Sequence, residues 1–242
     1  MGYVSYILRI SFVLDRVKSL RRIQVTFRTT KFPIAKIQKK LYLCKKIEYM
    51  SRKLETEEII RISTEEFKQA KKISLVMVLD NVRSMHNIGS VFRTSDAYLV
   101  EKVVLCGITA QPPHPEIHKS ALGAEFSVDW EYYADTNDAV AALKAQGYEV
   151  WAIELAENSV MLQDFFNRHT YSPQGLGEVI DGSSQLSTKY AVVLGNEVKG
   201  VQQSVIDQCK GCIELPQFGT KHSLNVSVTA GIVIWEFFKH IK

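Results

Sequence analysis

The sequence lacks the features that mark membrane-spanning proteins and disulfide-rich secreted proteins. No apolar run approaches the roughly 20 residues needed to cross a bilayer, although apolar residues make up 46% of the chain. Only four of the 242 residues are cysteine and no secretory signal is recognisable, so we expect a reduced, cytoplasmic protein with no membrane partner. The length and the 23% of charged residues fit a globular chain with one sizeable core, or a core with a modest appendage.

The small net charge of +4 hides an uneven distribution along the chain. Residues 1–49 hold 12 of the 30 Lys and Arg residues but only 2 of the 26 Asp and Glu residues, a balance of +10, and the remaining residues have a balance of −6. A basic N-terminal extension of this kind would attract nucleic acid by counterion release. It also has the composition of an organellar transit segment, and an upstream extension before a start at Met50 is a third interpretation. Composition leaves all three open.

Apolar runs and helical patterns alternate from residue 73 onward, and this alternation predicts an α/β fold with a mostly parallel sheet. Near-continuous apolar runs, as expected of strands covered on both faces, occur at residues 73–79, 102–108, 148–155, 189–194 and 212–215. Helical patterns occur at residues 87–100, 136–146, 204–209 and 224–241. Asp135 is placed to cap the second of these helices, and Gly147 to end it.

Two segments fall outside this alternation. Residues 50–72 are polar and helix-prone, with glutamates early and lysines late, which suits the helix macrodipole. Residues 157–188 are rich in Ser, Gly, Gln and Asn, and we expect them to form an irregular surface excursion from the domain of residues 73–242. No glycine fingerprint of the Rossmann type follows the first strand, and the nearest candidate, Gly175-Leu-Gly177, lies inside this excursion. The absence of this glycine fingerprint argues against a cofactor site of the Rossmann type.

Polar and glycine residues gather at three junctions that follow predicted strands, at residues 80–93, 194–200 and 215–225. Ligands of open parallel sheets bind outside the carboxyl ends of the strands, so we expect the three junctions at one sheet edge. In the first junction Asn87 can cap the following helix, and Gly89 permits close approach of another backbone. Arg93 lies six residues further on, nearly two turns, and we expect it on roughly the same helix face as Asn87. Considered alone, this junction is better explained by a helix cap followed by a solvated arginine.

The second and third junctions are also ordinary when each is considered separately. Gly195 and Gly200 flank Glu197, which is consistent with a plain glycine turn. Ser223 and Asn225 are placed to begin the last helix, where such residues are common caps. Their occurrence together at one predicted sheet edge is what indicates a functional site.

The three junctions together resemble motifs 1, 2 and 3 of the SpoU (TrmH-type) branch of the SPOUT methyltransferases. Motif 1 matches Asn-Ile-Gly-Ser-Val-Phe-Arg at residues 87–93, motif 2 matches Gly-Asn-Glu-Val-Lys-Gly at residues 195–200, and motif 3 matches Leu215-Pro216 with residues 223–227. The resemblance covers roughly residues 73–240, in the family's order and spacing. It departs at Met85-His86, where many members have proline before the asparagine, and at Gln217, where methionine often follows the proline.

The resemblance implies a trefoil-knotted SPOUT-type fold, a homodimer, and S-adenosyl-L-methionine as the donor of a methyl group to a ribose 2′-hydroxyl of RNA. By the same resemblance, groups around Leu194, Gly195, Leu215, Leu224 and Asn225 would hold the adenosine part of the cofactor.

Arg93 corresponds to the catalytic residue proposed for the family. Because a guanidinium resists deprotonation in proteins, we expect Arg93 to orient the 2′-hydroxyl and an adjacent phosphate rather than to act as a literal base. Asn87, Glu197, Ser223 and Asn225 would be supporting polar groups in the catalytic site. For Glu197 and Asn225, purely structural hydrogen bonding is the alternative.

Three further features carry weaker indications. His118 and Lys119 follow the second strand and could contact RNA phosphate, but a loop packed on its own domain fits as well. Cys209 and Cys212 have a metal-like spacing without a second ligand pair, and we expect no metal there. The aromatic residues near the C-terminus, Trp235 and residues 237–238, are typical of a core or a dimer interface.

The sequence therefore predicts an enzyme that methylates the ribose of tRNA or rRNA. It favours tRNA, because no obvious RNA-binding fold is appended to the catalytic domain. One alternative is a catalytically inactive, resistance-type protein whose knot binds RNA and cofactor without turnover, and the intact motif residues argue against it. Another is a Rossmann-like domain for a different ligand, which the missing glycine fingerprint disfavours.

Overall fold

A computed structural model describes residues 7–12, 23–28, 52–168, 188–221 and 223–242, and it divides the chain into two units, Met1–Ile60 and Arg61–Lys242. The first unit contains an antiparallel strand pair, β1 (Ile7–Phe12) and β2 (Ile23–Arg28), and a short 3-10 helix, η1 (Thr56–Glu58). Most of the basic N-terminal extension lies outside the described residues, so its three interpretations stay open. The predicted helical segment 50–72 is split between the units, with only α2 (Thr64–Gln69) in the second.

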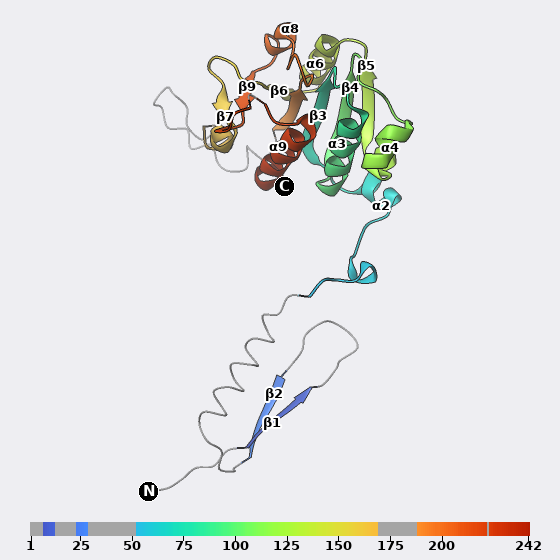
Figure 1. The fold of residues 1–242 in the computed structure, drawn as a ribbon, viewed down its shortest axis with the longest axis vertical. Coiled ribbons are helices and arrows are strands. Elements are labelled where there is room, and N and C mark those ends of the chain that lie inside the picture. Colours follow the sequence, from blue (N-terminus) through green and yellow to red (C-terminus); the bar gives the residue numbers. More distant parts are fainter. Residues whose placement is uncertain (1–6, 13–22, 29–51, 169–187, 222) are drawn as a thin grey trace. The chain divides into compact units, whose positions relative to one another are not determined.

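The second unit is built on a seven-stranded sheet in the order β5-β4-β3-β8-β6-β9-β7 (Figure 1). Every neighbouring pair in it is parallel. Five strands confirm the predicted apolar runs: β3 (Ile73–Asp80), β4 (Val100–Cys106), β6 (Tyr148–Ile153), β8 (Lys189–Leu194) and β9 (Gly211–Glu214). The two edge strands, β5 (Asp129–Tyr133) and β7 (Val160–Met161), lie outside the predicted apolar runs.

Helices cover both faces of this sheet, because alternate residues of the buried strands point to opposite sides. Leu75 and Met77 of β3 belong to one core cluster, while Val76 and Val78 belong to a second one. The first cluster includes residues of α3 (Met85–Ala97), α4 (Pro115–Ala121), α5 (Ala124–Ser127) and α9 (Val226–Ile241). The second includes residues of α6 (Thr136–Ala145) and α8 (Gln203–Ile206). Among the helices described, none is long and apolar enough to cross a membrane.

Strand β8 lies between β3 and β6, although β4, β5, β6 and β7 all come before it in the chain. The register aligns Leu194 with Leu79 on one side and with Ile153 on the other, and Ile153 in turn pairs with Ile213. The carboxyl ends of four neighbouring strands therefore meet at one edge of the sheet, as the sequence predicts. The knot implied by the family resemblance is not established by these pairings and stays a prediction.

Both predicted ends of helix α6 are confirmed, whereas the predicted end of α8 is wrong. The Asp135 carboxylate accepts a hydrogen bond of 2.8 Å from the Asn137 N–H at the start of α6, and Gly147 follows this helix with a φ of +86°. Helix α8 ends at Ile206, three residues before the predicted end at Cys209.

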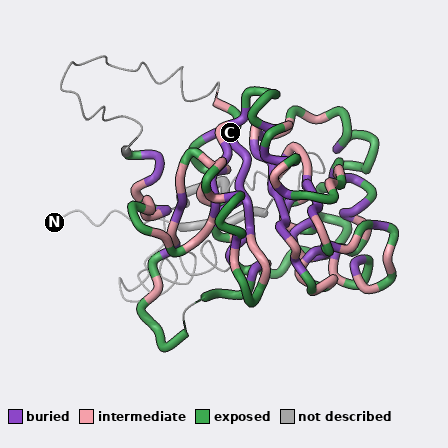
Figure 2. Tube along the Cα trace, turned by 90° about the horizontal axis from the view of Figure 1, so that it is seen from above, coloured by how far each residue is buried: buried purple, intermediate pink, exposed green. Residues whose placement is uncertain are grey.

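The expectation of an irregular surface excursion at residues 157–188 is wrong for its first part. Residues 160–168 form β7, a 3-10 helix η2 (Leu162–Asp164) and α7 (Phe165–Arg168). Leu162, Phe165 and Phe166 are buried in the first core cluster, and the Phe165 ring lies 5.0 Å from that of Trp151. In Figure 2 the buried stretches, in purple, run through the middle of the second unit, and exposed loops, in green, surround them. Residues 169–187, including Gly175-Leu-Gly177, lie outside the described residues.

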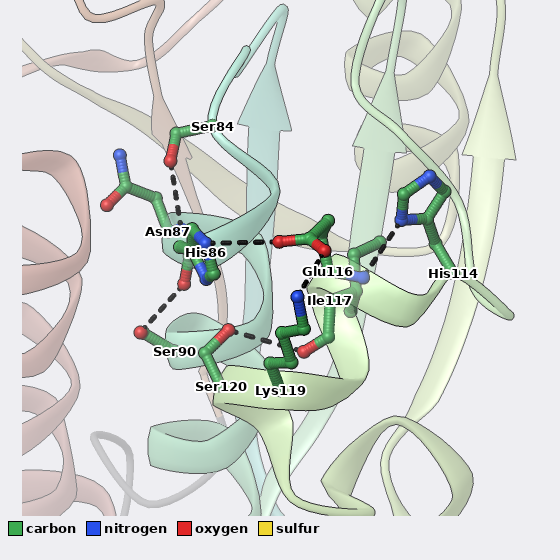
Figure 3. A network of polar contacts seen from close by, with 9 residues as sticks. All are labelled: Ser84, His86, Asn87, Ser90, His114, Glu116, Ile117, Lys119 and Ser120. Carbon is green, nitrogen blue, oxygen red and sulfur yellow. Dashed lines mark hydrogen bonds and ion pairs between the residues drawn. The ribbon is translucent and has the colours of Figure 1, made fainter.

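Helices α3 and α4 touch at Gly89, as the sequence predicts for this glycine. A Cβ at Gly89 would overlap the carbonyl oxygen of Ile117 and lie 2.9 Å from the backbone nitrogen of Ala121. Figure 3 shows the polar contacts above this point, where His86 Nε2 lies 3.3 Å from Glu116 Oε2 and Lys119 Nζ lies 2.5 Å from Glu116 Oε1. Backbone packing, with an ion-pair network at its rim, therefore fixes α3 against α4.

We expect the substitution Gly89→Ala to lower the free energy of unfolding by about 1–3 kcal/mol, because the new methyl group overpacks two helix backbones. Urea denaturation would measure this change. Gly231→Ala is the matched control, because a Cβ at this position within α9 meets no atom within 4 Å and alanine favours helix by up to about 1 kcal/mol. Equal effects of the two substitutions would contradict the proposed close contact at Gly89.

Candidate functional site

A cavity of about 560 Å³ lies where the carboxyl ends of β6, β8 and β9 meet the start of α9. Its walls are residues 153–155, 194–200, 213–215, 217, 223–226 and 229. All five residues predicted to bind the cofactor line it: Leu194, Gly195, Leu215, Leu224 and Asn225. Of the residues predicted to be catalytic, Glu197, Ser223 and Asn225 line the cavity, whereas Asn87 and Arg93 do not.

A chain of hydrogen bonds joins the three junctions to one another. The Asn87 side chain donates through Nδ2 to Glu197 Oε1 at 3.2 Å and accepts through Oδ1 from Asn225 Nδ2 at 3.1 Å. These three residues come from the start of α3, the loop after β8 and the start of α9. The structure thus brings together one predicted residue from each motif.

The Glu197 carboxylate accepts three hydrogen bonds in this network. Besides Asn87 it accepts the backbone N–H of Arg83 at Oε2 and that of Ser84 at Oε1, both at 3.1 Å. Partial burial acts to raise the pKa of Glu197, but the hydrogen bonds from Arg83, Ser84 and Asn87 outweigh it and hold this pKa below its usual range. Glu197 is therefore an anion that binds the two residues leading into α3, Arg83 and Ser84, and the Asn87 side chain in its first turn.

Helix α3 begins earlier than the sequence predicts, and this corrects two expectations. Ser84 caps it, accepting the Asn87 N–H at 3.3 Å, so Asn87 lies in the first turn and is not the cap. At about 100° per residue, six positions place Arg93 about 120° around the helix from Asn87. Arg93 is exposed, and no hydrogen bond or ion pair joins it to any described residue, so the structure does not bring it to the other predicted catalytic groups.

The loop after β8 is a closed turn that only glycine permits at its first position. A Cβ at Gly195 would overlap the backbone of Gly200 and the following nitrogen. The Asn196 side chain accepts the N–H groups of Val198 and Lys199 at 2.9 and 3.1 Å and donates to the carbonyl of Asn81 at 2.7 Å. The glycine turn considered in the sequence is therefore present, and it also forms one wall of the cavity.

Sequence analysis missed Glu154, which lines the cavity at the carboxyl end of β6. Its Oε2 accepts the Val201 N–H at 2.9 Å, and its Oε1 accepts the Leu155 N–H at 3.1 Å. The signal that would have found it is an acidic residue at the end of a predicted apolar strand, because such a position lies at the ligand-binding edge.

Asn225 caps helix α9, as predicted for the third junction. Its Oδ1 accepts the N–H of Ser227 at 2.9 Å and that of Val228 at 3.4 Å. The same side chain bonds Asn87 through Nδ2, so one amide both starts α9 and connects it to α3.

His118 and Lys119 lie on helix α4 rather than on a loop, and neither lines the cavity. His118 Nδ1 lies 2.5 Å from Glu125 Oε1, and Lys119 bonds Glu116. Cys209 follows α8 and Cys212 lies on β9, and both are free thiols. In the part of the chain that the structure describes, no group of three or more His, Cys, Asp or Glu side chains could hold a metal ion.

The sequence matches the SpoU rRNA Methylase family over residues 74–235, well over half of its length. The chain therefore belongs to this family, which confirms the resemblance drawn from the three motifs.

Individual relatives agree with this assignment. The 23S rRNA (guanosine-2′-O-)-methyltransferase RlmB of Nitrosomonas europaea is 31% identical over 166 residues, which are 69% of this chain and 56% of the relative. An AdoMet-bound rRNA methyltransferase from Sinorhizobium meliloti is 25% identical, with a TM-score of 0.58 over 73% of this chain and 60% of that one. The A. aeolicus TrmH/SpoU tRNA modifying enzyme, 22% identical, shares the fold, with a TM-score of 0.57 over 73% of this chain and 79% of that one. The chain spans 56–61% of the length of such curated relatives.

Glu197→Gln should lower the free energy of unfolding by about 1 kcal/mol at neutral pH, at the low end for bonds to a charged group because Glu197 is partly solvated. The folded-state pKa of Glu197 is lowered. Its contribution is therefore complete above the unfolded pKa, about 4.3, and is lost as the pH falls through the folded-state pKa. Urea denaturation from pH 7 to pH 3 should show the two proteins converging at the acid end.

The matched control for this pH series is Glu157→Gln, which changes an exposed carboxylate beyond the end of β6. It should leave the free energy of unfolding within about 0.5 kcal/mol of the unaltered protein at every pH. A wild-type advantage over Glu197→Gln that grows as the pH falls would contradict the assigned role of Glu197.

Proposed function

We propose that this protein uses S-adenosyl-L-methionine to methylate a ribose 2′-hydroxyl of tRNA or rRNA. Membership of the SpoU family supports the reaction class, and the relatives named as RNA methyltransferases support RNA as the substrate. The observation that carries the proposal is the cavity at the carboxyl ends of β6, β8 and β9, joined to α3 through Asn87, Glu197 and Asn225.

The cavity fits an adenosine-bearing cofactor. Its walls combine apolar side chains with the backbone polar groups of two loops, which is the usual composition of a site for a small organic ligand. The closed turn at Gly195 removes side-chain atoms from one wall, so the backbone itself can contact a flat ring. Leu194, Leu215 and Leu224 are placed to enclose the adenosine part. The AdoMet-bound relative from Sinorhizobium meliloti supports this assignment.

S-adenosylmethionine supplies an electrophilic methyl group on a sulfonium that needs no acid to leave. The chain's own residues must then align the 2′-hydroxyl and help its proton to depart. Arg93 is exposed on α3, with no partner among the described residues. We assign it to the hydroxyl and an adjacent phosphate, and this phosphate contact assists loss of the hydroxyl proton to solvent. Asn87, Glu197 and Asn225 hold α3, the loop after β8 and α9 together, and we assign Ser223, which lines the cavity, to support the bound groups.

Loss of the gene should remove at least one 2′-O-methyl mark from cellular tRNA or rRNA. Mass-spectrometric mapping of ribose methylation in total tRNA and rRNA, with and without the gene, would detect it and name the substrate. The purified protein with S-adenosylmethionine should restore the mark on RNA from the deletion strain. A complete set of marks in that strain would contradict the proposed activity, and cofactor binding without turnover would favour an inactive RNA-binding protein.

Arg93→Lys should lower kcat/KM on the mapped RNA at least about tenfold, equivalent to about 1.4 kcal/mol of transition-state stabilisation. The reason is that lysine keeps the charge but lacks the planar fork that contacts a hydroxyl and a phosphate together. Arg61→Lys is the matched control, since Arg61 is exposed and lines no part of the cavity. Near-normal turnover by Arg93→Lys would rule out the assigned role.

A further inference from the structure

The buried carboxylate of Asp80 neither lines the cavity nor belongs to the hydrogen-bond chain of Asn87, Glu197 and Asn225. Asp80 ends strand β3 and its exposed fraction is 0%. No Lys, Arg or His within the described ranges forms an ion pair with it. A buried charge without a cation is costly unless hydrogen bonds satisfy it. The segments that donate hydrogen bonds to Asp80 are therefore held in place by it.

Four hydrogen bonds reach Asp80 from three segments. Its Oδ1 accepts Thr136 Oγ1 at 2.5 Å, Asn81 Nδ2 at 2.7 Å and Gln202 Nε2 at 3.2 Å, while Oδ2 accepts the backbone N–H of Gln202 at 3.3 Å. Thr136 is the first residue of α6, so this bond connects Asp80 to the start of that helix. Burial raises the pKa of the neighbouring Cys106 to about 12, so this thiol adds no second charge.

Gln202 follows the loop after β8, and the chain from Asp80 to Ser84 binds this loop along its whole length. The carbonyl of Asn81 accepts Asn196 Nδ2 near the start of the loop, and the N–H groups of residues 83 and 84 hold Glu197 in its middle. Asp80 holds its far end through Gln202. Residues 195–200, the part of the loop that these bonds hold in place, form a wall of the cavity.

We propose that Asp80 is a positioning residue that fixes the far end of the cofactor-binding loop, residues 195–202, by accepting both donors of Gln202. This inference rests on the proposed function, because it assigns the loop to S-adenosylmethionine. Asp80 does not line the cavity, and the role proposed for it is exerted through Gln202. Its carboxylate is needed as an acceptor on both oxygens, because donors approach from both sides.

The substitution Asp80→Asn tests this acceptor role with almost no change in volume. Its amide keeps one acceptor oxygen, which will serve the three donors at the Oδ1 position. The NH₂ group must then face the Gln202 N–H, so two donors oppose each other at the end of the loop. We expect the dissociation constant for S-adenosylmethionine, measured by calorimetry on the full chain, to rise at least tenfold.

Thr136→Val is the matched control, because it removes a donor to the same carboxylate from the α6 side and leaves Gln202 in place. It should lower the melting temperature as much as Asp80→Asn but change cofactor affinity less than twofold. With the mapped RNA as substrate, Asp80→Asn should raise KM for S-adenosylmethionine and keep kcat at saturation within threefold. A merely structural role would affect both variants alike.

Gln202→Ala keeps the proposal testable if Asp80→Asn fails to fold, since Gln202 is exposed and only its side-chain donor is lost. We expect about threefold weaker cofactor binding and faster amide exchange over residues 195–202, with exchange in α6 unchanged. Unchanged cofactor affinity in both Asp80→Asn and Gln202→Ala, or equal losses in Asp80→Asn and Thr136→Val, would overturn the role of Asp80 alone. Failure of the unaltered protein to bind S-adenosylmethionine would instead contradict the proposed function, and this inference with it.

Discussion

The bonds of the Glu197 carboxylate to the start of α3, at Arg83, Ser84 and the Asn87 side chain, are the constraint on which the rest of the site depends. Glu197 lies more than 110 positions from Arg83 and Ser84 in the chain, yet one carboxylate accepts both of their N–H groups. The first N–H groups of a helix have no partner within it, and they carry its partial positive charge. An anion on the loop after β8 is therefore held where α3 begins, and Asn87 extends this contact to Asn225 and α9.

This contact forms because β8 lies between β3 and β6. Parallel neighbours whose registers align Leu79, Leu194 and Ile153 end at the same level. The loops that follow these strands therefore lie next to one another at the sheet edge. Their backbone N–H and C=O groups need hydrogen-bond partners there. Side chains supply them: Asn196 bonds the carbonyl of Asn81, and Glu154 accepts the N–H of Val201. The cavity is the space left between loops that are fixed in this way.

The sequence predicted those parts of the fold that depend on local pattern and missed those that depend on distant partners. Strand β8 has the predicted bounds because its residues are apolar on both faces, whereas the edge strand β5, with exposed Asp129 and Tyr132, shows no such run. The residues predicted from the family motifs to bind the cofactor all line the cavity. Ser84 and Asn87 are equally good helix caps by sequence. The structure identifies Ser84 as the cap, because its side chain accepts the backbone N–H of Asn87. The burial of Phe165 comes from its contacts with Trp151 and other distant aromatic rings, which no local pattern encodes.

Charge placement bears on how such a site would meet RNA. The chain beyond residue 49 carries a balance of −6, so long-range attraction of a polyanion cannot come from its net charge and requires local cations. Several lysines are already neutralised, since Lys119 pairs with Glu116 and Lys102 with Glu131. Arg93 is exposed on α3 without such a partner among the described residues. Because Arg93 lies outside the cavity, its guanidinium does not compete with the cofactor for space and stays available to a phosphate.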